Sequence, residues 1–200
     1  MNISMFKVIC VTQMSAAEDF PKQLEKICAA GIDRVILREK HLTENDYEAL
    51  AGKVIKICEK YNTPLSLHTF VQAAKRLDCK AIHLSYADFT AGKGRGFDIV
   101  GVSVHSLQEA IAAEMSGATY ITAGHIFATD CKKGVPPRGT DFLKEICSKV
   151  HIPVYGIGGI TAENAELVYG TGASGVCIMS GLMKADDPDR IIDAVHKISI

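Results

Sequence analysis

The stretch IPVYGIGGITAENAELVYGTGASGVCIMSGL, residues 152–182, contains the structural unit that decides the fold. It begins with a short apolar run and a glycine turn, continues as a helical pattern after Thr161, and ends with a small-residue turn and a second β-branched run. Short continuous apolar runs are typical of strands that are covered on both faces. Two such strands joined by a helix predict a parallel βαβ unit with a right-handed crossover.

The same alternation of apolar runs and helical patterns extends along the whole chain. We predict strands at residues 6–12, 33–39, 64–68, 80–85, 99–104, 119–127, 153–159 and 175–180. Between them, Thr43, Ser106 and Thr161 each precede acidic residues at the start of a helical pattern, as a capped helix N-terminus does. Eight strands in this alternation favour a closed barrel over an open sheet. We therefore predict a single-domain (β/α)₈ TIM barrel over residues 1–200.

The composition narrows the class of protein. Apolar residues form 48% of the 200 residues, enough for a sizeable core, and 22 basic against 23 acidic side chains give a net charge of −1. A nucleic-acid-binding protein usually has a basic excess, so we expect no nucleic-acid partner. The apolar runs are too short to span a bilayer and the N-terminus lacks the pattern of a secretion signal, so we expect no membrane partner.

Cysteine usage agrees with a cytoplasmic protein. The chain has seven cysteines without CxxC spacing, which we interpret as reduced and mostly buried thiols. The sequence does not give the oligomeric state and leaves a homodimer open.

Glycine and serine residues at the ends of the last two predicted strands indicate a phosphate site. Gly158 and Gly159 follow the seventh strand, and Ser180 and Gly181 follow the eighth. In (β/α)₈ barrels the active site lies at the C-terminal ends of the strands, and the loops after strands seven and eight commonly bind phosphate. Backbone N–H groups and a helix N-terminus would supply the donors. The alternative is that these glycines only form tight turns.

The run ILREKH, residues 36–41, places basic side chains at the end of the second strand. In a continuing strand, Ile36, Arg38 and Lys40 share one face. We expect Arg38 and Lys40 to point into the barrel mouth and bind anionic groups, for which the guanidinium fork is suited. The alternative is a solvated strand end with ordinary surface charge. Ser103, at the end of the fifth strand, is a lesser candidate for substrate binding.

The segment GHIFATDCKKGVPPRG, residues 124–139, is the longest predicted loop and therefore a candidate for function. His125 stands where the sixth strand gives way to this loop, and an imidazole suits acid–base chemistry near neutral pH. The alternative is a structural, hydrogen-bonded histidine. His83 lies in the middle of a strand and is expected to pack inside the barrel. The sequence has no HExxH or clustered Cys/His spacing, so we expect no metal site of the zinc type.

Several of these motifs together resemble one superfamily. LREK (37–40), GVSVHSLQEAIAAEMSGATYI (101–121), the 124–139 loop and the glycine-containing strand ends within 152–182 resemble thiamine phosphate synthase and its relative, thiazole tautomerase. The resemblance extends over essentially the whole chain and is more specific in the second half. It implies a (β/α)₈ barrel that binds a phosphorylated thiazole as its small-molecule partner.

The two branches of this superfamily differ in chemistry. The synthase joins a pyrimidine diphosphate to the thiazole phosphate using magnesium, and its pattern carries Asn-Asp-Arg after the third strand and Gly-Gln-Glu-Asp after the fourth. Here His68, Thr69 and Phe70 replace the first run, and only Asp88 persists in the second. Threonine is a poor substitute for a magnesium-binding carboxylate. His125 stands where the synthase usually has proline, and there the chain resembles the tautomerase.

The resemblance therefore implies an isomerase, a thiazole tautomerase of thiamine biosynthesis that uses no cofactor. It would convert a carboxylated dihydrothiazole phosphate to the aromatic thiazole phosphate carboxylate, with His125 moving the proton. Arg38 and Lys40 would hold the carboxylate side, with Lys132 as a further cation and Ser103 as a lesser contact. The residues implied for the phosphate are Gly158, Gly159, Ser180 and Gly181.

Two alternatives stay open. One is a thiamine phosphate synthase, which would need magnesium and would release pyrophosphate from both substrates. The other is a regulatory protein that binds thiazole phosphate without turning it over.

Overall fold

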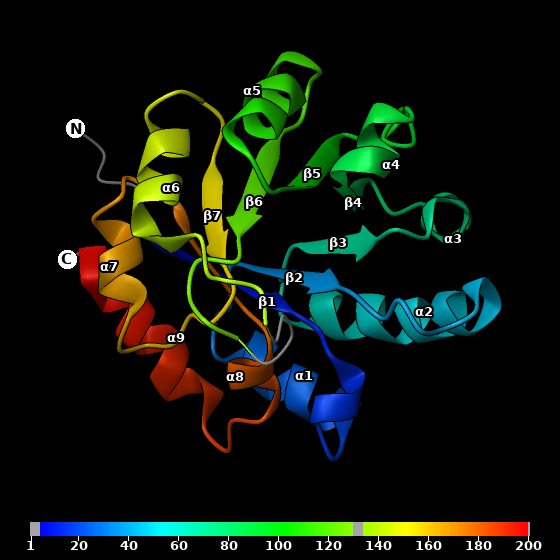
Figure 1. The fold of residues 1–200 in the computed structure, drawn as a ribbon. Coiled ribbons are helices and arrows are strands. Elements are labelled where there is room, and N and C mark those ends of the chain that lie inside the picture. Colours follow the sequence, from blue (N-terminus) through cyan, green and yellow to red (C-terminus); the bar gives the residue numbers. More distant parts are fainter. Residues whose placement is uncertain (1–4, 130–133, 200) are drawn as a thin grey trace.

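A computed structural model describes residues 5–129 and 134–199 of the chain. Within these ranges, eight parallel strands follow one another around a closed barrel, because β1 pairs with both β2 and β8 (Figure 1). The strands are β1 (Lys7–Val11), β2 (Arg34–Leu37), β3 (Leu65–His68), β4 (Ala81–Ser85), β5 (Ile99–Val104), β6 (Tyr120–Gly124), β7 (Val154–Ile157) and β8 (Gly175–Ile178). The predicted (β/α)₈ TIM-barrel fold is confirmed.

Helices surround the strands on the outside of the barrel (Figure 1). The α-helices are α1 (Phe20–Ala29), α2 (Glu44–Lys60), α3 (Val71–Arg76), α4 (Tyr86–Thr90), α5 (Leu107–Met115), α6 (Gly139–Cys147), α7 (Ala165–Tyr169), α8 (Ser180–Met183) and α9 (Pro188–His196). Short 3₁₀ turns are η1 (Met14–Ala16) and η3 (Lys197–Ser199). The short helix α8 directly follows β8, so the last strand is followed by two helices, α8 and α9.

Two of the three predicted helix starts have the expected caps. The side chains of Thr43 and Ser106 accept the backbone N–H three residues on, at the starts of α2 and α5. The third prediction is wrong in position, because α7 begins only at Ala165. There the Asn164 side chain accepts the N–H of Thr161 at 2.9 Å and holds a turn instead of a first helical turn.

Five strands, β1, β2, β6, β7 and β8, end earlier than predicted, and the ends of β2 and β6 bear on the site. β2 ends before Arg38, so Arg38 and Lys40 are not strand residues and the expected alternation of faces does not apply to them. The backbone leaves the ladder because the N–H of Arg38 donates to the Thr12 hydroxyl at 2.9 Å. β6 ends at Gly124, so His125 also lies outside its strand.

The core has two parts. The larger part is the apolar layer between strands and helices. The smaller part fills the barrel, and its apolar members are Ile9, Val11, Ile36, Tyr120, Tyr155 and Cys177. Polar side chains share the barrel interior, where Ser66, His68, His83 and Thr122 are each at most 4% exposed. Burial of a polar group is costly unless the group is hydrogen-bonded, so these side chains need partners.

In the described ranges, no helix is long and apolar enough to cross a membrane. The six described cysteines are free thiols, and four of them are buried. Cys131 lies outside the described residues.

Candidate functional site

The residues after β2 form one wall of the barrel mouth. Glu39 is only 3% exposed, and one of its carboxylate oxygens accepts the Thr12 hydroxyl at 2.7 Å and the N–H of Met14 at 2.8 Å. These bonds tie the end of β2 to the segment after β1 and hold half-buried Arg38 and exposed Lys40 on either side. The sequence analysis gave Glu39 no role. The sequence feature that could have indicated a role for Glu39 is a carboxylate between two basic residues at the end of an apolar run.

A cavity of about 270 Å³ opens beside this wall. It is lined by Gln13, Ser15, Arg38, Glu39, Lys40, His41 and Met179. Because Met179 directly precedes Ser180, the cavity joins the predicted cationic residues to a predicted phosphate-binding strand end. A larger cavity, about 400 Å³, lies against α1 and the end of α8, but none of the predicted site residues that the structure describes lines it.

The wall of the mouth cavity is electropositive. Burial lowers the pKa of Lys40 and the positive charge of Arg38 lowers it further, whereas Asp88 acts in the opposite direction. A bound anion would favour the charged form of Lys40 in the same way as a neighbouring carboxylate does. The wall therefore favours an anionic ligand over a neutral or cationic one.

The glycine-rich end of β7 packs against the segment after β6. Gly158 has φ of 101°, and a Cβ atom there would lie 2.3 Å from the Cβ of His125. Gly159 has φ of 66°, and its Cβ would lie 2.3 Å from the carbonyl oxygen of Ala128. Packing within the chain thus already requires glycine at both positions. Their binding of phosphate stays a prediction.

The other two predicted phosphate residues begin α8. Ser180 and Gly181 are exposed and directly follow Met179 of the cavity. The first N–H groups of a helix have no acceptor within the helix. In (β/α)₈ barrels a short extra helix near the last strands commonly takes part in phosphate binding. The binding of phosphate by Ser180 and Gly181 stays a prediction.

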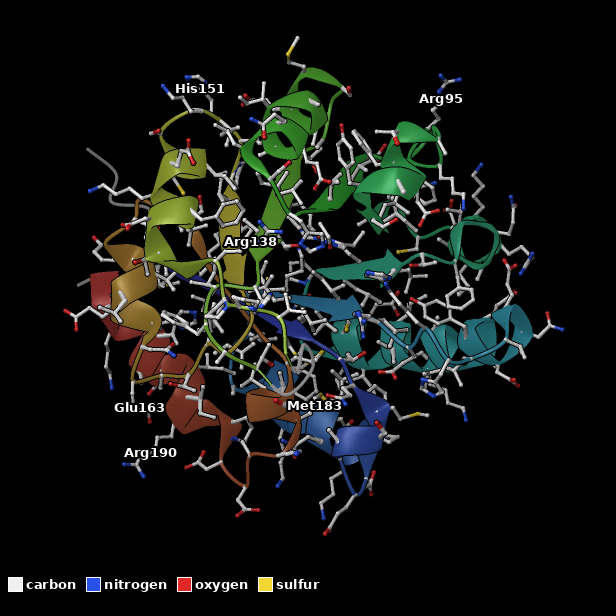
Figure 2. All side chains as sticks on the ribbon, viewed as in Figure 1. Arg95, Arg138, His151, Glu163, Met183 and Arg190 are labelled. Atoms are coloured by element: carbon white, nitrogen blue, oxygen red, sulfur yellow. The ribbon has the colours of Figure 1, made fainter. Side chains whose placement is uncertain are left out.

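His125 is nearly buried, with 5% of its surface exposed, and does not line the cavity. Its Nε2 lies 3.2 Å from the carbonyl oxygen of Val135, and its own carbonyl oxygen accepts the N–H of Arg138 at 3.0 Å. The described part of the loop therefore folds back onto the histidine, and Figure 2 shows Arg138 near the middle of the view. The Nδ1 atom of His125 is buried without a hydrogen-bond partner among the described residues. Lys132, predicted as a further cation, lies outside the described residues.

Ser103 lies at the end of β5 and is hydrogen-bonded to a buried histidine. Its Oγ is 2.9 Å from Nε2 of His83, whose Nδ1 is 3.0 Å from the Tyr120 hydroxyl. His83 is 2% exposed, as expected for a residue that packs inside the barrel. The sequence analysis missed that its two ring nitrogens connect the barrel interior to Ser103.

Thr69 and Asp88 stand at the positions where the synthase pattern carries metal ligands. The side chains of both residues are already hydrogen-bonded to other side chains of the protein. The Oγ1 atom of Thr69 lies 2.6 Å from Nδ1 of His68. Asp88 accepts the Lys93 ammonium at 2.6 Å on one oxygen and the Ser85 hydroxyl at 2.8 Å on the other, and its pKa is lowered chiefly by Lys93. Across residues 5–129 and 134–199, no group of three or more His, Cys, Asp or Glu side chains is arranged to hold a metal ion.

Comparison with known proteins finds relatives over nearly the whole chain. The family described as thiamine monophosphate synthase matches residues 6–182. The thiamine-phosphate synthase of Clostridium acetobutylicum is 37% identical over 204 residues, which cover 97% of each chain. Thiamine-phosphate synthase 2 of Streptococcus pneumoniae is 35% identical over 203 residues, which cover 98% of this chain and 97% of that protein. The solved structure of thiamine phosphate pyrophosphorylase from Pyrococcus furiosus has a TM-score of 0.82 at 26% identity, covering 98% of this chain and 96% of that one.

These relatives contradict the predicted tautomerase. Proteins that share more than a third of their residues with this chain over nearly its full length are named synthases. The isomerase prediction is therefore wrong by this comparison, and the synthase alternative is the one that the relatives support. The error arose from the weight given to Thr69 and His125, two positions where the chain departs from the synthase pattern within an otherwise similar barrel.

Proposed function

The chain belongs to the thiamine monophosphate synthase family, and we propose that it is a thiamine-phosphate synthase, a transferase that joins a pyrimidine diphosphate to a thiazole phosphate. The observation that carries this proposal is the mouth cavity, which Arg38 and Lys40 share with Met179 at the end of β8. Both substrates carry phosphate groups. The cavity brings basic side chains and the start of a short helix together, and both favour such groups.

Charge moves in a defined direction during the proposed reaction. The bond between the pyrimidine substrate and diphosphate breaks as the thiazole takes the place of the diphosphate, so negative charge develops on the leaving group. Cations fixed beside a developing charge stabilise the transition state. We assign this role to Arg38 and Lys40, because a guanidinium can bind two phosphate oxygens at once and Lys40 is close enough to Arg38 for its pKa to be lowered. Lys132 stays a proposed third cation.

The remaining predicted residues have proposed roles on the other side of the mouth. Ser103 would donate a hydrogen bond to the substrate. His125 would give a proton to the departing diphosphate from a doubly protonated ring, because Nε2 already donates its hydrogen to the carbonyl oxygen of Val135. The proton would leave from Nδ1, which has no partner among the described residues. Catalytic hydrogen bonds are often completed only when substrate is bound, so the cover of the ring by Val135 is compatible with this role. The residues proposed for the thiazole phosphate are Gly158, Gly159, Ser180 and Gly181.

The side chains of the mouth do not fit the magnesium ion that the family implies. Magnesium prefers carboxylate oxygens and bound water in octahedral geometry. Thr69 has no carboxylate, and both oxygens of Asp88 already have partners in Lys93 and Ser85. We therefore derive no step through a metal ion and assign the neutralisation of diphosphate to basic side chains of the protein. This assignment is a proposal that an assay with a chelator tests.

The test of the function is formation of thiamine phosphate from the two purified substrates. We expect product with the wild-type protein and a loss of about tenfold or more in kcat/KM for Lys40→Ala, since one stabilising contact to the leaving group is removed. Lys56→Ala is the matched control, because Lys56 is an exposed lysine on α2 away from the cavity. Binding of thiazole phosphate without any product, with or without magnesium, would refute the synthase and favour a binding protein.

A further inference from the structure

The register of the barrel brings polar residues of three strands side by side. Gly101 in β5 pairs with His83 in β4 and with Tyr120 in β6. A Cβ atom on Gly101 would lie 2.1 Å from Cζ of Tyr120 and 2.5 Å from Nδ1 of His83. Because glycine leaves this space open, the Tyr120 hydroxyl reaches Nδ1 of His83 at 3.0 Å. The contact between the two rings thus depends on the residue between them having no side chain.

The next layer of side chains is closer to the mouth. Ser103 in β5 pairs there with Thr122 in β6. The Oγ atom of Ser103 lies 2.9 Å from Nε2 of His83 and accepts the Thr122 hydroxyl at 3.3 Å. His83 and Thr122 are each 2% exposed, whereas Ser103 is only partly buried. Ser103 is therefore the member of this group that a ligand in the mouth can contact.

Arg34, on the side of Tyr120 away from the mouth, sets the direction of the hydrogen bonds among these side chains. A guanidinium only donates, and Nη1 of Arg34 donates to Oγ of Ser66 at 2.9 Å. The Ser66 hydroxyl acts to lower the pKa of the Tyr120 phenol, as a donor to the phenol oxygen does. The Tyr120 hydroxyl lies 3.0 Å from Nδ1 of His83, which is the acceptor left for the hydrogen of Tyr120. In this arrangement the proton of His83 lies on Nε2, which faces the Ser103 oxygen at 2.9 Å and the Thr122 oxygen at 3.4 Å. We call Arg34, Ser66, Tyr120, His83 and Ser103 the interior network.

His83 is neutral in this network. Burial lowers its pKa to about 3, and the positive charges of Lys40, Arg34 and Arg38 act in the same direction. A neutral imidazole has one nitrogen that donates and one that accepts, as the interior network requires. An imidazolium would donate from both nitrogens and would leave the Tyr120 hydroxyl without its acceptor.

We propose that His83 is a positioning residue, which together with Tyr120 fixes Ser103 so that the Ser103 O–H donates into the barrel mouth. The Ser103 oxygen already accepts from His83 and from Thr122, so its own hydrogen is directed to a ligand. The substrate group at this position is therefore an acceptor, a phosphate oxygen or an unprotonated ring nitrogen. The identity of that substrate rests on the proposed function, whereas the direction of the hydrogen bonds does not.

The first test reads the tautomer of His83 in the free protein. Long-range ¹H–¹⁵N correlation spectra of the ¹⁵N-labelled protein at pH 7 are expected to show His83 protonated on Nε2. In Tyr120→Phe, which keeps the ring but removes the donor to Nδ1, the population protonated on Nδ1 is expected to rise. A wild-type His83 that is protonated on Nδ1, or on both nitrogens, would overturn the proposal.

The second test asks whether Tyr120 acts through Ser103. Binding of thiazole phosphate and of thiamine phosphate is measured by calorimetry for the two single variants and the double variant. Ser103→Ala is expected to weaken binding about tenfold and Tyr120→Phe about threefold, the scale of one hydrogen bond. If the effect passes through Ser103, the double variant binds like Ser103→Ala alone. Independent effects would multiply to about thirtyfold and would overturn the proposal.

The control variant is Tyr155→Phe. Tyr155 is a buried tyrosine of the same barrel interior that meets Tyr120 edge to face and is not part of the interior network. The Tyr155→Phe variant is expected to bind both compounds like the wild type and to leave the His83 tautomer unchanged. Neither test needs turnover. If the protein forms no thiamine phosphate, the proposed function is refuted, but the two tests still decide whether His83 positions Ser103.

Discussion

Lowering the pH from 7 to 5 is expected to destabilise the folded protein through two histidines inside the barrel. His68 and His83 are 4% and 2% exposed, and burial lowers their pKa values to about 2 and about 3 from an ordinary 6.5. Their rings stack 5.4 Å apart, and the charges of Lys40 and Arg38 act in the same direction on both. Both imidazoles therefore stay neutral in the folded state at pH 5.

The unfolded chain behaves differently, because its histidines bind protons as the pH falls through 6.5. The stability that depends on neutral histidine is fully present above pH 6.5. Below it, each histidine costs up to about 1.4 kcal/mol per pH unit until the pH approaches the folded pKa. Between pH 7 and pH 5 one histidine accounts for about 2 kcal/mol of unfolding free energy and the pair for about 4 kcal/mol. That is a large part of the roughly 5–15 kcal/mol of a typical domain.

Urea unfolding of the wild type and of His83→Gln at the two pH values measures this effect. Groups other than His83 titrate in both proteins, so the difference between them isolates His83. The unfolding free energy of His83→Gln should change with pH by about 2 kcal/mol less than that of the wild type. His151→Gln is the control, because the His151 side chain is 94% exposed and projects from the periphery of the molecule (Figure 2). Equal pH dependence of the wild type and His83→Gln would refute the reasoning. So would a His83 ring signal that titrates above pH 5 in the folded protein.

Product formation is expected to continue in excess EDTA, because Thr69 has no carboxylate and Asp88 is bound to Lys93. Loss of activity that only magnesium restores would contradict this. His125→Gln is expected to lower turnover by about 10²–10⁴-fold with thiazole phosphate binding unchanged, the effect of losing a positioned acid. A loss below about tenfold would leave His125 only the structural role that its contact with Val135 indicates. Gly158→Ala is expected to lower the unfolding free energy by about 3 kcal/mol or more, since positive φ and overlap with His125 add together. Gly117 is the control, because its φ is 90° but no atom lies within 4 Å of a Cβ placed there. Gly117→Ala should therefore lower the unfolding free energy by only about 1–2 kcal/mol. Equal losses for Gly158→Ala and Gly117→Ala would exclude the overlap with His125 as a cause.

The fold could be predicted from the sequence because its signals are local. Each predicted apolar run overlaps one strand of the barrel, and the run at 99–104 matches β5 at both ends. The caps at Thr43 and Ser106 act within four residues, so they too are visible in a short stretch of sequence. In a repeated βα unit, local periodicity and right-handed crossovers leave few other topologies.

The end of β2 could not be predicted, because its cause lies in another strand. Arg38 leaves the ladder when its N–H donates to Thr12, and Glu39 turns inward to meet Thr12 and Met14. These residues are 25 to 27 positions apart, and no periodicity within ILREKH indicates the contact. Arg38 and Lys40 both line the mouth cavity, but they lie outside β2, so the alternation of faces that predicted their orientation does not apply to them. Their binding of substrate stays a prediction.

The barrel interior shows how register turns separated residues into one functional unit. His83 and Tyr120 are 37 positions apart and reach each other only because both pair with Gly101 of the strand between them. Gly101 looks in the sequence like a weak point in an apolar strand, since glycine normally weakens a strand interior. In the barrel, Gly101 leaves the space in which the buried side chains of His83 and Tyr120 form a hydrogen bond with each other. The cost of burying these polar groups is thus offset inside the core, and the remaining donor of the network emerges at Ser103, where a ligand can use it.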